Sequence, residues 1–154
     1  MATLYTLRVI FFSSEALVLG LAWLIHLHFD QPIQIFASSL SLNDEVLKYL
    51  MMLPVAIGVW VINESRLLLQ QDDQSIRILT AWPHYWRLRI HAIVGLAYAI
   101  VFSLIAFIPW TTKAGISTGT GMILFATSIL GQLSLAASVY MARITVNEIL
   151  APLK

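Results

Sequence analysis

Glu15 is the residue of this 154-residue chain whose type and position most directly suggest chemistry. It lies within an apolar stretch, seven residues after Arg8, which is about 10 Å along a helix at about 1.5 Å per residue. A charged side chain inside a membrane-spanning helix costs roughly 2.5–3.5 kcal/mol on insertion scales, so it needs a partner or a function. Three roles fit Glu15: pairing with Arg66 or Arg143 to fix the helix register, exchange of a proton or cation, or a polar contact with a partner protein.

Further polar residues are expected at the depth of Glu15, because consecutive spanning helices run in opposite directions. They stand near the ends or starts of the later apolar stretches. The predicted polar cluster, in the cytoplasmic half of the protein, comprises Glu15, Asn63, Glu64, Arg66, His91 and Arg143. The sequence carries no phosphate-binding loop, nucleophile elbow or His-Glu-x-x-His motif beside it, and this favours a non-catalytic role.

The pattern His26-x-His28-x-Asp30 is a candidate metal site, because the three side chains would share one face of an extended segment. In a helix, His26 and His28 diverge by about 200°, which favours a pair of interfacial histidines without a metal or cofactor. A haem held between two histidines is disfavoured as well. His84 and His91 are expected at the opposite membrane face, across about 30 Å of hydrocarbon.

The composition indicates the class of protein to which these residues belong. Hydrophobic residues make up 59% of the chain and charged residues 11%. Soluble domains average about 45–50% and about 25%, so a soluble enzyme, a disordered chain and a nucleic-acid binder are excluded. The net charge is +1, and the chain has no cysteine, which excludes disulfides, thiol catalysis and iron–sulfur clusters. The sequence predicts an integral membrane protein.

Four stretches are long and apolar enough to cross a bilayer as helices of about 20 residues. They run over about 7–29, 46–69, 90–110 and 120–142, so the expected fold is an all-α, four-helix transmembrane bundle forming a single domain, 1–154. One side of this arrangement carries seven basic residues: Arg8, Arg66, Arg77, Arg87, Arg89, Arg143 and Lys154. The other carries only Lys48 and Lys113. Since basic loops stay in the cytoplasm, both termini are expected there, in a bacterial inner (plasma) membrane.

Small residues recur at steps of three or four in the last two stretches, which places each set on one helix face. Such stripes let helix backbones approach closely in lipid, where apolar contact alone gives little reward. The predicted packing residues are Gly95, Ala99 and Ser103 in one stretch and Gly131, Ser134 and Ser138 in the other. The two stripes are expected to face each other or a partner subunit.

These features favour a protein that acts by binding another membrane protein, either as an accessory subunit of a membrane complex or as an immunity-type protein against a pore-forming toxin. Self-association is the other possibility for the packing faces, and membrane lipids are the remaining partners. The alternative is a small oligomeric ion or proton channel or transporter that uses Glu15. A third class is a haem or quinone redox subunit.

Overall fold

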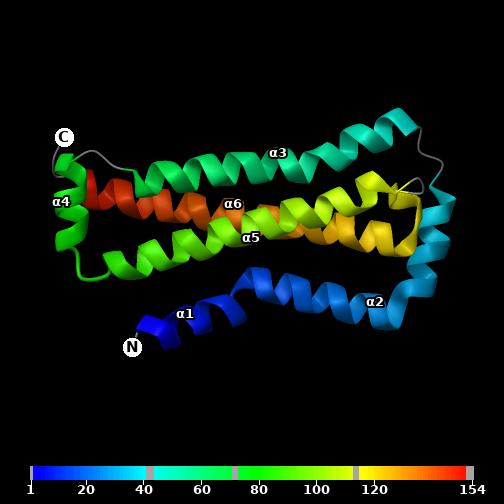
Figure 1. Ribbon diagram of the computed structural model, residues 1–154, viewed down its shortest axis with the longest axis horizontal. Coiled ribbons are helices and arrows are strands. Elements are labelled where there is room, and N and C mark those ends of the chain that lie inside the picture. Colours follow the sequence, from blue (N-terminus) through cyan, green and yellow to red (C-terminus); the bar gives the residue numbers. More distant parts are fainter. Residues whose placement is uncertain (1, 41–43, 71–72, 113–114, 152–154) are drawn as a thin grey trace.

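The computed structural model describes residues 2–40, 44–70, 73–112 and 115–151, and every regular element within these ranges is helical. Figure 1 shows long helices lying side by side, with a short helix across one end. In chain order the elements are α1 (Ala2–Phe11), α2 (Ser14–Ser39), α3 (Asp44–Leu69), α4 (Asp73–Ala81), α5 (Tyr85–Thr111), the 3-10 helix η1 (Gly115–Ser117) and α6 (Gly119–Leu150).

Among the described residues, four helices are long and apolar enough to cross a membrane: α2, α3, α5 and α6. In α3 the qualifying segment is Met52–Leu69. For the described residues, the structure therefore confirms the prediction of an all-helical protein with four helices long and apolar enough to span a membrane.

The helix α6 is the centre of the packing. It contacts α2, α3 and α5 along its length, and α3 and α5 also pack against each other. The buried core lies among these helices and includes Val61, Phe102, Leu135 and Val139. By contrast, α2 packs against α6 and touches η1, but it makes little contact with α3 or α5. The core is thus built by three helices, with α2 added on the side of α6.

The two ends of the molecule differ in their basic residues. The start of α1, the helix α4 and the end of α6 lie at one end, whereas residues 30–39 of α2 run across the other (Figure 1). Arg66 lies in the last turn of α3, Arg77 lies on α4, and Arg87 lies in the first turn of α5, so all three belong to the α4 end. Leu79 anchors α4 there, because its side chain is fully buried.

The expected first span, 7–29, is divided between two helices. The chain leaves the helical conformation at Phe12 and Ser13, and α2 begins with Ser13 as its N-cap. The Ser13 hydroxyl accepts a hydrogen bond from the backbone N–H of Ala16 at 3.2 Å. On the other side of the break, the hydroxyl of Tyr98 donates to the carbonyl of Ile10 at 2.6 Å. A break at membrane depth requires such partners, because lipid offers backbone groups none.

A second departure from the expected span lies at Phe29, whose φ of −125° and ψ of 16° are not helical. The chain bends there and continues as helix to Ser39, although the first apolar stretch was expected to end at about residue 29. Pro32 falls in the first turn of the new helical segment. A proline is tolerated at such a position because its missing N–H would have no helical partner in any case.

Candidate functional site

Glu15 lies in the first turn of α2, with its side chain turned toward α6 and only 6% of the residue exposed. The hydroxyl of Ser14 donates a hydrogen bond to Glu15 Oε1 at 3.0 Å. The hydroxyl of Ser134 on α6 lies 2.9 Å from Ser14 Oγ and 3.3 Å from Glu15 Oε1, so it shares its hydrogen between them. Two serine hydroxyls are therefore placed to donate hydrogen bonds to the same carboxylate oxygen.

No arginine, lysine or histidine forms an ion pair with Glu15 in the part of the chain that the structure describes. The pairing with Arg66 or Arg143 that would fix the helix register is absent, because Arg143 instead binds Glu64 at 3.0 Å. The break before Ser14 supplies a different stabilisation. It places the free N–H groups and the positive end of the α2 dipole beside the carboxylate.

A cavity of about 80 Å³ lies beside Glu15 at the junction of α1, α2, α5 and α6. Most of its wall is apolar, including Val9 and Leu135, while Glu15, His91, Ser13 and Ser138 line it with polar groups. One water molecule needs roughly 10–15 Å³ on this measure and two or more polar partners. The cavity therefore has the size and the polar lining to hold water between the carboxylate and the imidazole.

His91 connects this cavity to the arginine-bearing end of the protein. Its Nε2 lies 2.9 Å from the hydroxyl of Tyr5 on α1. The Tyr5 ring also packs edge-on against Trp86, with ring centroids 5.0 Å apart. The guanidinium of Arg87 stacks over both rings, at 5.5 and 5.4 Å from their centroids. These contacts fasten the short helix α1 to the start of α5 and place it beside the cavity.

The remaining members of the predicted polar cluster lie elsewhere. Glu64 and Arg143 form an ion pair between α3 and α6, with side chains 13% and 52% exposed. Asn63 and Arg66 are exposed on α3. The structure thus joins Glu15 and His91 through a cavity, joins Glu64 and Arg143 directly, and leaves the other two residues at the surface.

The small residues of the predicted stripes contact different neighbours. Ala99 is fully buried and Gly131 faces the ring of Phe102, so both lie between α5 and α6. Ser103 faces Gln132 on α6, with Gln132 Nε2 donating to its hydroxyl at 3.1 Å. Gly95 faces Leu135 of α6 and, like Ser138, lines the cavity beside Glu15, whereas Ser134 turns to α2 rather than α5. Only part of the two stripes therefore serves the contact between α5 and α6.

Gln132 is a buried residue that the sequence analysis missed. It is fully buried, and its Nε2 donates to the carbonyl of Ala99 at 2.9 Å as well as to Ser103. Gly58 on α3 leaves room for this amide, since an added Cβ there would stand 2.6 Å from Gln132 Nε2. The signal was a lone amide side chain in the middle of an apolar stretch, which in lipid needs an interhelical partner.

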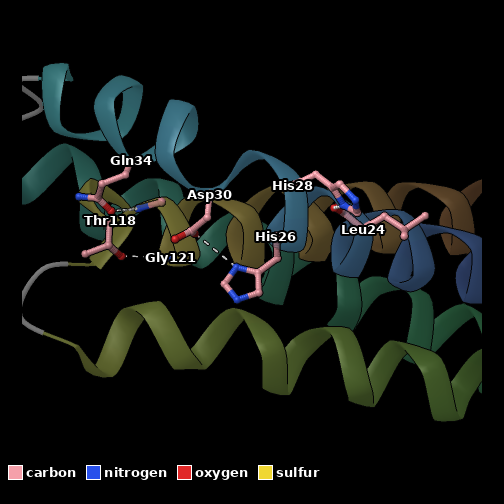
Figure 2. A network of polar contacts seen from close by, with 8 residues as sticks. Leu24, His26, His28, Asp30, Gln34, Thr118 and Gly121 are labelled. Atoms are coloured by element: carbon pink, nitrogen blue, oxygen red, sulfur yellow. Dashed lines mark hydrogen bonds and ion pairs between the residues drawn. The ribbon is translucent and has the colours of Figure 1, made fainter.

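The candidate metal residues do not come together. His26 Nδ1 lies 3.3 Å from Asp30 Oδ1, whereas His28 turns to another side of α2 and its Nδ1 lies 3.1 Å from the carbonyl of Leu24 (Figure 2). The segment is helical up to the bend at Phe29, so the alternation of an extended segment does not apply. Within the described ranges there is no group of three or more histidine and carboxylate side chains that could hold a metal ion.

No family model, no curated protein and no solved structure matches the chain.

Proposed function

We propose that the protein is a multi-pass protein of a bacterial inner (plasma) membrane that takes up and releases a proton at Glu15, as a small oligomeric channel or transporter. The observation that carries this proposal is the burial of Glu15 beside hydroxyl groups and a cavity, without a cation among the described residues. An ionisable group within a membrane is costly, and such groups commonly mark ion and proton pathways.

The partners of Glu15 suit proton exchange better than a fixed structural role. A serine hydroxyl can donate to a carboxylate or accept from a carboxylic acid, since it has one hydrogen and two lone pairs. Ser14 and Ser134 can therefore form hydrogen bonds with Glu15 both before and after it takes up a proton. An arginine in their place would bind the charged form strongly and oppose protonation.

The arrangement also supplies a route to one membrane face. The cavity extends from Glu15 to His91, whose imidazole contacts the Tyr5 hydroxyl near the arginine-bearing end. An imidazole can accept a proton on one ring nitrogen and donate one from the other, which makes it an effective relay. By the bias of basic residues, this end is the cytoplasmic one, with both chain termini there and the four apolar helices bundled across the bilayer.

Proton flux into liposomes tests the proposal. We expect purified protein in vesicles with a trapped pH-sensitive dye to pass protons under an imposed potassium-diffusion potential. The substitution Glu15→Gln keeps the shape of the side chain but removes the exchangeable proton, and we expect at least a tenfold loss of flux. Glu64→Gln is the matched control, because Glu64 is bound to Arg143 outside the cavity. Its flux should stay near that of the wild type.

The proposal is wrong if the Glu15→Gln protein passes protons as fast as the wild type, or if folded wild-type protein passes none. Circular dichroism and elution as a single species show that each variant is folded before its flux is compared. A separate measurement follows the carboxylic acid itself by infrared difference spectroscopy. A carbonyl band that appears on acidification and is absent in Glu15→Gln identifies Glu15 as the proton acceptor.

A second candidate function, binding to another membrane protein, is favoured by the exposure of α2. Its most apolar 18-residue window contains no buried residue, against 39% buried in α6. An accessory subunit or an immunity-type protein would use such a face. A photocrosslinker at Leu21, 58% exposed on α2, should then join one membrane protein in stoichiometric yield, while one at Val59, 62% exposed on α3, should not. Adducts with lipid alone at both positions contradict this candidate.

A further inference from the structure

A second pocket, of about 320 Å³, lies between α2, α5 and α6. His26 lines this pocket with a polar side chain. It lies about 16 Å further along α2 than Glu15, at about 1.5 Å per residue. The walls are mainly apolar and include Leu19, Ile105 and Leu124, with Trp23 beside His26. Pockets that bind small molecules commonly enclose about 300–1,000 Å³ and combine apolar walls with few polar groups.

The two ring nitrogens of His26 differ in their surroundings. Nδ1 lies beside the Asp30 carboxylate, and Nε2 has no hydrogen-bond partner among the described residues. Nδ1 lies 3.3 Å from Asp30 Oδ1 as an ion-pair contact; both atoms are buried and neither has a hydrogen-bond partner in the described chain, while the two side chains as a whole are 40% and 49% exposed. Figure 2 shows the imidazole projecting from α2 toward α5, with its second nitrogen directed away from Asp30. A carboxylate only accepts hydrogen bonds, so a neutral imidazole beside it carries its proton on Nδ1. Nε2 is then left as a hydrogen-bond acceptor on the imidazole that lines the pocket.

We propose that this pocket binds a lipophilic molecule with a hydroxyl group on an aromatic ring, of the phenol or quinol type. The hydroxyl donates to His26 Nε2, and the ring packs against Trp23 and the aliphatic wall. The Trp23 and His26 rings stand 6.5 Å apart at an interplanar angle of 52°, which is within the range in which aromatic rings attract one another. Asp30 is a positioning residue that fixes the proton on Nδ1.

The chemistry of the wall selects this class over other occupants. An ion or a sugar would lose its hydration to apolar side chains without enough polar partners. An acyl chain fills an apolar pocket but has no donor for Nε2. The hydroxyl hydrogen of Thr127 is already used, since it is donated to the carbonyl of Ile123 at 2.6 Å. The site does not depend on proton uptake at Glu15, and a quinol would connect it with the redox class that the sequence allows.

Binding of two matched probes to the full chain in nanodiscs tests the proposal. The probes are 4-hexylphenol and 4-hexyltoluene, which differ only in a hydroxyl against a methyl group. The readout is the part of the tryptophan fluorescence change that the variant Trp23→Phe lacks, with affinities referred to the probe concentration within the bilayer. We expect saturable binding of the phenol, roughly tenfold tighter than that of the toluene, as one buried hydrogen bond supplies.

Three variants locate the preference for the hydroxyl. His26→Phe keeps a ring of similar size but removes the acceptor, and the two probes should then bind equally. Asp30→Leu leaves the imidazole without its partner, so the preference should fall to an intermediate value. His28→Phe is the matched control, because the His28 ring lies on another side of α2 near the carbonyl of Leu24. Its preference should equal that of the wild type.

Equal affinity of the wild type for both probes, or binding that never saturates, overturns the proposal in favour of occupation by lipid chains. A preference that survives in His26→Phe places the hydroxyl elsewhere and also overturns it. If His26→Phe fails to fold, Asp30→Leu and the wild-type comparison decide between the same outcomes. Proton flux measured in Glu15→Gln bears on the other site alone, so the two proposals fail separately.

Discussion

The helices α6 and α2 are both long and apolar and pack against each other, yet they are held in the protein in different ways. α6 buries residues from Gly119 to Val146 and contacts three other long helices. Of the fully described residues 14–39 of α2, only Glu15 and Ala37 are buried. Small side chains on α6 permit close backbone contact, which is the main source of helix association in lipid.

The contacts of α2 with α6 include hydrogen bonds near both of its ends. At one end Ser134 bonds Ser14 and Glu15, and at the other the Gln34 side chain accepts a hydrogen bond from the Gly119 N–H at 2.6 Å. Both pockets described above lie along this boundary. The tightly packed helix α6 therefore provides the scaffold, whereas the loosely packed α2 carries the groups that could bind protons or ligands.

The largest loss of stability is expected when an aromatic ring of α5 that packs against α6 is removed. Phe102 is fully buried against α6, so Phe102→Ala should lower the free energy of unfolding by about 3–5 kcal/mol. Phe36→Ala on α2, 57% exposed, should change it by less than about 0.5 kcal/mol. Unfolding in mixed micelles, followed by circular dichroism, measures both. Similar losses in the two variants would show that α2 is packed as firmly as α6.

An intermediate effect is expected from adding a single methyl group to each helix. In Gly131→Ala the new Cβ would overlap the Phe102 ring, and forcing α5 and α6 apart should cost about 1–3 kcal/mol. Gly20→Ala on α2 meets no atom within 4 Å and should be neutral, or stabilising by roughly 0.5–1 kcal/mol through helix propensity. The shift in unfolding midpoint distinguishes the two. A destabilising Gly20→Ala would mean that this face of α2 is covered.

The smallest expected effect tests the hydrogen bond at the far end of α2. Gln34→Ala removes the acceptor of the Gly119 N–H and should cost about 0.5–1.5 kcal/mol. Gln31→Ala, three residues earlier and exposed, is the matched control and should leave stability unchanged. Hydrogen exchange at the start of α6, read by mass spectrometry, should rise only in Gln34→Ala. An equal rise in the control would show that the hydrogen bond between Gln34 and the Gly119 N–H does not hold α2 against α6.

The helical class and the four apolar helices followed from the sequence, because length and composition alone decide whether a helix suits a bilayer. The break between α1 and α2 did not. Phe12-Ser13-Ser14 lies in an apolar run, and the group that completes the break, Tyr98, is distant in the chain. A local pattern cannot reveal a hydrogen bond made between residues 88 positions apart.

The candidate site was predictable in its residue types and less so in its pairings. The unusual position of Glu15 within an apolar stretch marked it directly, and the opposite directions of the helices placed His91 at the same depth. Which arginine pairs with which carboxylate depends on helix rotation, which periodicity alone does not fix. In the structure Arg143 pairs with Glu64, and Glu15 accepts a hydrogen bond from a serine hydroxyl instead of pairing with an arginine.

The bend at Phe29 and the break at Ser13 together limit how far α2 can reach through a bilayer. The segment 14–29 is about 24 Å long at about 1.5 Å per residue, whereas a typical hydrocarbon layer measures about 30 Å. In a bilayer, the missing length would have to come from local thinning or from insertion of α1, whose Leu4, Leu7 and Phe11 are exposed. If α1 inserts, we expect a thicker membrane to draw it inward and to strain the break at Phe12 and Ser13 beside Glu15, so that lipid chain length would act on this site.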